Sequence, residues 1–285
     1  MPLIWLVIKF DFMARKQLFK HNDVTELDIS HHQVESCRGT VLLYPGIGLT
    51  TRLYEIPFET LEELKLSCIE YHPPAHGRSR GHMTMENALS GLENYLSKTE
   101  VTAPLFIIGH SAGANACIQY FSKTPTISLA TMYLVQPVFS FAESARYMYH
   151  QNNYKELFEA IKQWVTDPQR LEEIIRKPDW LNRDFWEAKN LKTEIDSYSQ
   201  GILLGDFLED FYISDNDTHE RIQELPIGRI FLSSNDSWYE PEIIRQVATK
   251  HQIALDTVDE AKDHFFRDGW THAWKIILND ICMRL

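Results

Sequence analysis

The chain has 285 residues with 40 acidic and 28 basic side chains, so its formal net charge at pH 7 is −12. Hydrophobic residues make up 44% and charged residues 24%, a balance typical of a globular protein with a sizeable core and not of a disordered or fibrous one. The acidic balance argues against nucleic acid as a partner, because phosphate binding needs a clustered cationic surface. No window approaches the roughly 20 apolar residues that span a bilayer, so we expect a soluble protein with no integral membrane segment.

The N-terminal segment needs its own interpretation. Residues 2–8 are apolar, but Lys9 and Asp11 interrupt the run. A secretory signal would place basic residues before the apolar run and small residues at a cleavage site, and neither is present. We interpret residues 1–13 as an N-terminal extension in front of a start at Met13, with an added strand as the alternative.

The predicted elements begin with short polar strands over residues 15–36, joined by a turn at 21–23. From residue 40 onward, compact apolar runs alternate with stretches whose apolar residues recur at helical spacing. The predicted strands of this part are 40–44, 66–71, 105–108, 129–135, 229–232 and 253–258. The predicted helices are 52–65, 83–97, 112–121, 240–250 and 270–283. Such alternation indicates a parallel sheet with right-handed crossovers, and hence an α/β fold.

The alternation stops between residues 138 and 226, where 89 residues contain helical patterns but no clear strand. We therefore divide the chain into an α/β core of residues 14–137 and 227–285 and a helical insertion of residues 138–226. The insertion contains 14 aromatic residues, enough to line an apolar pocket, although we expect most of them to pack within the insertion itself.

The cysteines are sparse and form no CxxC pair; they are Cys37, Cys68, Cys117 and Cys282. Such usage fits a reducing compartment, so we expect a cytoplasmic protein. No local motif supports a nucleophilic thiol, and small buried apolar side chains are the better interpretation.

The segment 109–113, with the sequence GHSAG, lies between the predicted strand 105–108 and the predicted helix 112–121. In a G-x-S-x-G turn the serine occupies a strained corner between strand and helix, and small neighbours let the chain fold that tightly. The corner exposes the hydroxyl, and the N–H of the next residue stays free at a helix N-terminus, where negative charge is favoured. This placement predicts that Ser111 is a nucleophile and not an ordinary loop serine.

With this motif in this context, the chain from about residue 38 onward resembles the α/β-hydrolase family, and within it the serine aminopeptidase and lysophospholipase-type hydrolases. The family places nucleophile, acid and histidine in that order, the last two in loops after late strands. Asp236 follows the predicted strand 229–232, and His264 follows the predicted strand 253–258. The resemblance implies a mostly parallel central sheet flanked by helices, with residues 138–226 inserted as a helical cap.

The resemblance also implies a role for each site residue. His264 takes the proton of Ser111 during attack, and Asp236 orients the imidazole and stabilises its cation. The backbone N–H groups of Ile47 and Ala112 form the oxyanion hole. No cofactor and no metal are implied.

Each role has a rival in the sequence. His272 lies eight residues beyond His264 but falls within a predicted helix, where a packed or surface histidine is commoner. The alternative position for the acid, after the predicted strand 129–135, holds Gln136-Pro137 and no carboxylate. His110 is predicted to point away from the site and to serve in packing.

Two other kinds of site have little support. No G-x-G-x-x-G opens a helix after the first predicted parallel strand, which argues against a dinucleotide site. The pairs His31-His32 and His72…His76 lack matching acidic or cysteine partners nearby, so we interpret them as surface or loop histidines and not as metal ligands.

Together these features predict a serine hydrolase of the carboxylesterase/lipase type (EC 3.1.1-like) that cleaves a small-molecule ester through an acyl-enzyme intermediate. The insertion has 18 acidic against 10 basic side chains, a charge typical of a solvated helix surface. If part of it faces the entrance, it disfavours anionic substrates such as acyl-CoA. The same machinery serves amidases, peptidases, lactonases and thioesterases, and the sequence does not choose among them. A rival from another class is a non-catalytic protein that binds a small molecule on the same fold.

Overall fold

The computed structural model describes residues 15–23, 25–124, 128–151, 169 and 217–285. The predicted N-terminal extension and most of the predicted cap lie outside these residues, so both stay predictions.

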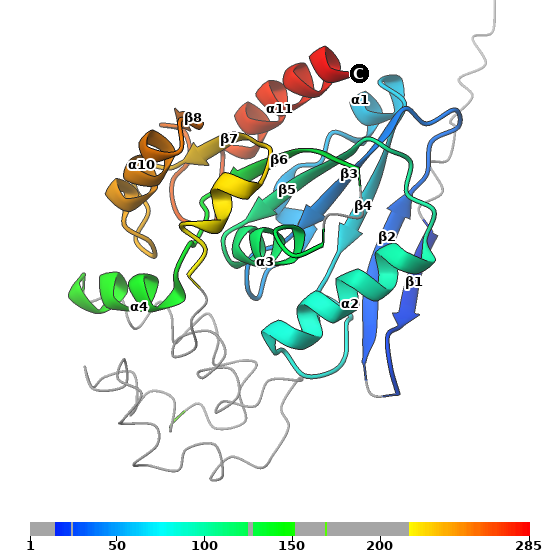
Figure 1. The fold of residues 1–285 in the computed structure, drawn as a ribbon, viewed down its shortest axis with the longest axis horizontal. Coiled ribbons are helices and arrows are strands. Elements are labelled where there is room, and N and C mark those ends of the chain that lie inside the picture. Colours follow the sequence, from blue (N-terminus) through cyan, green and yellow to red (C-terminus); the bar gives the residue numbers. More distant parts are fainter. Residues whose placement is uncertain (1–14, 24, 125–127, 152–168, 170–216) are drawn as a thin grey trace, which may run out of the picture.

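A single eight-stranded sheet forms the centre of the described structure (Figure 1). Its strand order is β1-β2-β4-β3-β5-β6-β7-β8. The strands are β1 (Arg15–Lys20), β2 (Glu26–His32), β3 (Gly39–Tyr44), β4 (Leu66–Tyr71), β5 (Leu105–His110), β6 (Leu129–Val135), β7 (Ile227–Leu232) and β8 (Ala254–Thr257). The β1–β2 and β2–β4 pairs are antiparallel, and every other neighbouring pair is parallel. The fold class predicted for the core is therefore confirmed.

Helices cover both faces of this sheet. The helices of the described chain are η1 (Thr51–Tyr54), α1 (Phe58–Glu63), α2 (Met85–Lys98), α3 (Ala112–Phe121), α4 (Phe141–His150), η4 (Arg221–Glu224), α10 (Pro241–Lys250) and α11 (Trp270–Arg284). One hydrophobic cluster joins one face of the sheet to α2, α3, α4 and α10, and a second joins the other face to α1 and α11. The result is a three-layer arrangement with two cores.

Strand β3 shows why the central strands are apolar throughout. Val41 and Leu43 belong to the cluster under α1 and α11, whereas Leu42 and Tyr44 belong to the cluster under α2 and α3. Successive side chains of a strand point to opposite faces, so a strand covered on both faces buries every residue. All six residues of β3 are buried.

The predicted helix 52–65 is wrong in one respect, because it is divided into η1 and α1. Glu55 adopts a left-handed conformation with φ of 47°, and Pro57 caps the N-terminus of α1. Proline lacks an N–H and disfavours helical geometry in the residue before it, so the helix cannot continue through Ile56. The apolar spacing correctly indicated helical structure, but it gave no sign of this break.

The remaining boundaries differ from the predictions by a few residues at most. Strand β7 begins at Ile227, and α10 begins with Pro241 in its first turn, a position that suits a residue without an N–H. Within the described part of the chain, no helix is long and apolar enough to cross a membrane.

Candidate active site

Ser111 lies at the sharp turn between β5 and α3, near the carboxyl ends of the parallel strands. Its backbone has φ of 54° and ψ of −122°, a strained conformation for a residue with a side chain. Its N–H donates to the carbonyl of Val135 on the neighbouring strand β6 (3.0 Å), and its carbonyl accepts from Ala114 (3.0 Å). These bonds hold the corner in place, as the G-x-S-x-G turn predicts.

The two glycines of the motif are required by close packing. A Cβ added to Gly113 would lie 2.4 Å from the carbonyl oxygen of Pro45 and 2.5 Å from that of Tyr44. A Cβ on Gly109 would lie 2.7 Å from the Cα of Ala114. Helix α3 therefore approaches the end of β3 more closely than any larger residue would allow.

The structure brings Ser111, His264 and Asp236 into one hydrogen-bonded row. The Ser111 Oγ lies 2.7 Å from His264 Nε2, and His264 Nδ1 lies 2.8 Å and 3.0 Å from the two carboxylate oxygens of Asp236. A carboxylate can only accept, so Nδ1 carries the proton and Nε2 accepts from the serine hydroxyl. All three residues are buried. The row can move a proton from Ser111 to His264 and hold the resulting cation against Asp236.

Asp236 is itself held by its own loop. Its Oδ1 accepts from the N–H groups of Trp238 (2.7 Å) and Tyr239 (3.1 Å). The Trp238 indole then lies parallel to the His264 ring, with 5.3 Å between ring centroids and 6° between planes. The aspartate is thus oriented by the backbone, and the imidazole by the aspartate and the indole together.

The described ends of the predicted insertion contact the loop that carries Asp236, residues 233–240, which we call the acid loop. Ser144 on α4 donates to the carbonyl of Trp238 (2.8 Å), and the hydroxyl of Tyr147 donates to the carbonyl of Asp236 (3.4 Å). At the other end of the insertion, the N–H of Thr218 donates to the carbonyl of Phe139 (3.0 Å). The two ends of the insertion therefore meet beside the acid.

Two backbone N–H groups lie free near Ser111. Among the residues that the structure describes, neither the N–H of Ile47 nor that of Ala112 has a hydrogen-bond acceptor. Ala112 is the first residue of α3, and Ile47 lies in the turn after β3. This turn lies close to the nucleophile, because a Cβ added to Gly46 would be 3.0 Å from the Cβ of Ser111. Both groups are thus available to an anionic oxygen at the site.

The rival residues of the sequence lie elsewhere. His272 is exposed on α11, and no described contact joins it to Ser111. Gln136 is buried at the end of β6, where its side-chain oxygen accepts from the N–H of Ser233 (2.9 Å) at the start of the acid loop. The absence of a carboxylate at Gln136 was evident from the sequence, whereas its hydrogen bond to Ser233 was not.

The histidines that the sequence analysis assigned to surfaces or loops are buried. His31, His32, His72 and His76 all expose less than a tenth of their surface, so they are not surface histidines. His31 and His32 lie on β2, whereas His72 and His76 do lie in the loop after β4. His32 pairs with Glu70 (2.8 Å), and His76 accepts from the N–H of Gly48 (2.6 Å). Within the described residues, no cluster of histidine, cysteine and acidic side chains has the geometry to hold a metal ion.

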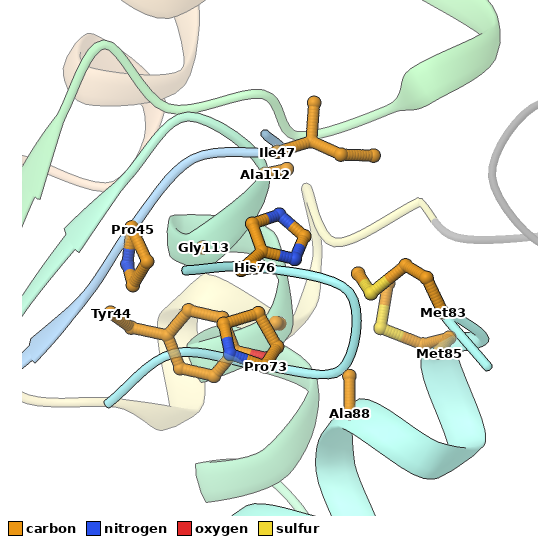
Figure 2. Close-up of a pocket in the computed structure, with 11 residues that line it drawn as sticks. Tyr44, Pro45, Ile47, Pro73, His76, Met83, Met85, Ala88, Ala112 and Gly113 are labelled. Carbon is orange, nitrogen blue, oxygen red and sulfur yellow. The ribbon is translucent and has the colours of Figure 1, made fainter. Parts of the chain in front are cut away.

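A small apolar pocket adjoins the two free N–H groups (Figure 2). Its lining includes Ile47 and Ala112 themselves, and Figure 2 shows Met83 and Met85 together at one side of it. The free space is about 10 Å³, comparable to one water molecule. The full lining is Tyr44, Pro45, Ile47, Pro73, His76, Met83, Met85, Ala88, Ala112, Gly113 and Ala116.

Comparisons with known proteins identify the fold. No family model and no curated protein sequence matches the chain. Among solved structures, Est1E from Butyrivibrio proteoclasticus, solved with ferulic acid bound, is 13% identical with a TM-score of 0.64, over 94% of this chain and 98% of that one. An esterase from Pyrococcus furiosus is 14% identical with a TM-score of 0.63, over 100% and 95% of the two chains.

A third similar structure is a bromoperoxidase from Bacillus anthracis, at 15% identity and a TM-score of 0.59 over 92% of this chain and 98% of that one. These structures share the α/β-hydrolase fold, and the present chain has that fold. Because one fold hosts several activities, function must be argued from the site.

Proposed function

We propose that the protein is a serine hydrolase that cleaves a small, neutral carboxylic ester through an acyl-enzyme intermediate. The observation that carries this proposal is the row of Ser111, His264 and Asp236, with 2.7 Å and 2.8 Å between the reacting side-chain atoms. A serine hydroxyl is a weak nucleophile unless a base is within hydrogen-bond reach and oriented by a third group, and this row meets both conditions.

In the first half of the reaction, Ser111 Oγ attacks the ester carbonyl carbon while His264 Nε2 takes the hydroxyl proton. The carbonyl oxygen becomes an anion and accepts hydrogen bonds from the N–H groups of Ile47 and Ala112. Such preorganised donors contribute about 3 kcal/mol each to transition-state stabilisation. The intermediate collapses, the alcohol leaves with the proton from His264, and the acyl group stays on Ser111.

In the second half, water attacks the acyl-enzyme and gives one proton to His264. The second tetrahedral intermediate uses the same two N–H groups. Its collapse releases the carboxylic acid and returns the proton to Ser111 Oγ. Throughout the cycle Asp236 stays ionised and holds the imidazole in the tautomer that the two half-reactions need.

Several features support an ester as the substrate. Two of the similar structures are an esterase and Est1E with ferulic acid bound, at 13–14% identity. The pocket beside the free N–H groups is apolar, and the predicted cap has 18 acidic against 10 basic residues, which favours neutral over anionic substrates. The small free volume favours a short acyl group on the carbonyl carbon.

The test is hydrolysis of p-nitrophenyl acetate by the wild type and by Ser111→Ala. We expect the substitution to lower kcat/KM by at least about 1000-fold, because the remaining groups cannot form the acyl-enzyme. Ser122→Ala is the matched control, since Ser122 caps the C-terminus of the same helix and, among the described residues, its hydroxyl donates to the carbonyl of Gln119 (3.3 Å). A folded wild type without activity on any ester, or an active Ser111→Ala, would contradict the proposal and favour a binding protein.

A further inference from the structure

The turn after β3 contains three successive N–H groups, and side chains from outside the turn accept hydrogen bonds from the two outer ones. The N–H of Gly46 donates to the hydroxyl of Tyr54 (3.0 Å), and the N–H of Gly48 donates to His76 Nε2 (2.6 Å). Between them, the N–H of Ile47 has no acceptor among the described residues. A further bond from the N–H of Leu49 to the carbonyl of Gly46 (3.1 Å) closes the turn.

The tautomer of His76 follows from the hydrogen bonds that its two ring nitrogens make to the backbone. Its Nδ1 lies 2.8 Å from the carbonyl oxygen of Pro74, which can only accept, so Nδ1 carries the proton and Nε2 is the acceptor for Gly48. Burial lowers the pKa of His76 to about 4, so the ring stays neutral at neutral pH. Figure 2 shows this imidazole in the pocket beside Ile47 and Ala112.

Tyr54, which accepts from the N–H of Gly46, also contacts His110, the residue before the nucleophile. Its hydroxyl lies 3.0 Å from His110 Nδ1, and His110 Nε2 lies 3.0 Å from the carbonyl oxygen of His264. That carbonyl must accept, so His110 Nε2 carries the proton and Nδ1 accepts from the tyrosine hydroxyl. Burial lowers the pKa of His110 to about 3 and raises that of Tyr54, which keeps both groups in these protonation states.

These bonds form one continuous chain. It runs from the Gly46 N–H through the Tyr54 hydroxyl and the His110 ring to the backbone of His264. Helix α11 anchors it, because Trp270 stacks on the Tyr54 ring (4.2 Å between centroids) and the Trp274 indole donates to the Tyr54 carbonyl (2.6 Å).

We propose that His76, Tyr54 and His110 are positioning residues that occupy the N–H groups on both sides of Ile47, aim its N–H at the reacting oxygen and tie this turn to the loop of His264. This inference rests on the proposed function. The three side chains touch no reacting atom. They act by fixing a donor before the transition state forms, which is where preorganisation lowers the barrier.

The main variant is Tyr54→Phe, which removes one oxygen and leaves the stacked ring. Tyr71→Phe is the matched control, because Tyr71 is also fully buried and its hydroxyl donates to the carbonyl of Ala88 (3.0 Å), outside this chain of bonds. Tyr54→Phe loses the bonds to the Gly46 N–H and to His110 Nδ1, and Tyr71→Phe loses one bond. Both variants therefore lose buried hydrogen bonding, but only Tyr54→Phe loses it beside the Ile47 N–H.

We expect Tyr54→Phe to lower kcat by about 10- to 100-fold with KM changed less than twofold, a part of the effect of losing a whole oxyanion donor. Affinity for a boronic acid, which forms a tetrahedral anion on Ser111, should fall by the same factor. Tyr71→Phe should lower thermal stability, by no more than Tyr54→Phe does, and keep kcat within twofold of the wild type.

His76 provides a second test by rescue. His76→Phe removes the acceptor for Gly48 and should lower kcat as Tyr54→Phe does, whereas His76→Gln places an amide oxygen near the former Nε2 and should restore most of the rate. If His76→Phe does not fold, Tyr54→Phe decides the question alone. Wild-type kcat in Tyr54→Phe, or an equal loss in Tyr71→Phe, would overturn the inference, while an inactive wild type would overturn the proposed function itself.

Discussion

At the scale of single residues, the site depends on three loops that present Ser111, Asp236 and His264 to one another. The strained corner at Ser111 has its cause in Gly109 and Gly113, whose missing side chains let α3 approach β3. Asp236 is oriented by two N–H groups of its own loop, and His264 by the aspartate. Each proposed role thus has a local structural cause.

The two candidate bases differ sharply in environment and give a direct prediction. His264→Ala should lower kcat on p-nitrophenyl acetate by on the order of 1000-fold or more, because Ser111 loses its proton acceptor. His272→Ala should leave kcat within twofold of the wild type, since His272 is exposed on α11. The comparison is made by steady-state kinetics on both variants. A severe loss in His272→Ala with an active His264→Ala would reverse the assignment.

The G-x-S-x-G turn predicted Ser111, and the resemblance to the α/β-hydrolase family predicted that Asp236 and His264 lie beside it. The three residues meet because each follows a strand whose end lies at the same edge of the sheet. The supporting residues could not be predicted in this way. His76, in the loop after β4, and Tyr54, at the end of η1, hold the turn of Ile47 and belong to no motif. His110, expected only to pack, also donates to the carbonyl of His264. Such contacts depend on the three-dimensional approach of loops, which hydrophobic periodicity does not record.

At the scale of elements, the alternating apolar runs predicted the strands well because buried parallel strands are apolar on both faces. Helices were predicted less exactly where one residue changes the backbone. Pro57 divides η1 from α1, although the apolar spacing continues across it. That break places Tyr54 at the end of η1, where its hydroxyl reaches Gly46.

The pocket between α2, α3 and the turn of Ile47 leads to a prediction on acyl length. Because Ile47 and Ala112 line this pocket, we expect the acyl substituent of a bound ester to extend into it, and its free space is about 10 Å³. We therefore expect kcat/KM for p-nitrophenyl esters to be highest for acetate and to fall towards octanoate, each excess methylene costing about 1 kcal/mol.

Shortening one side chain that lines the pocket should change the preferred acyl length of the substrate. Met85→Ala enlarges the pocket and should shift the best substrate to a longer acyl chain, whereas Met283→Ala, at an exposed methionine of α11, should leave the series unchanged. Equal rates on acetate and octanoate in the wild type would show that the acyl group lies elsewhere.

At the scale of the whole molecule, buried neutral histidines make stability depend on pH. Burial lowers the pKa of His76 to about 4 and of His110 to about 3, and it lowers that of His72 as well. In the unfolded chain these side chains have a pKa near 6.5. Below that pH the unfolded state therefore binds more protons than the folded state. The free energy of unfolding therefore decreases as the pH is lowered from about 6.5 to 4, by about 1.4 kcal/mol per pH unit for each fully buried histidine.

Other groups with shifted pKa values act outside this pH range. Glu143 and Asp217 raise the pKa of His219, so its stabilisation is present below about pH 6.5 and is lost at higher pH. Asp28 and Glu70 have lowered pKa values, and their contribution is lost only below about pH 4.5. Among the described residues, the slope between pH 6.5 and 4.5 therefore comes mainly from the three buried neutral histidines, and acidification over this range is destabilising.

Urea unfolding at pH 7.0, 6.0, 5.0 and 4.5 measures this slope. We expect the free energy of unfolding to fall steadily with acidification, and His76→Gln to make the slope shallower. His272→Gln, at an exposed position, should keep the wild-type slope. Stability that stays constant or rises on acidification would contradict the protonation states assigned to these rings.

The most direct test of the central claim is labelling with a fluorophosphonate probe, followed by intact-mass and peptide mass measurement. A serine activated by His264 should react with the phosphorus centre, lose the fluoride and gain one adduct mass on Ser111. The wild type is expected to take up a single adduct, and Ser111→Ala none. A folded wild type that stays unlabelled, or an adduct on any other residue, would contradict the assignment of Ser111 as the nucleophile of a hydrolase.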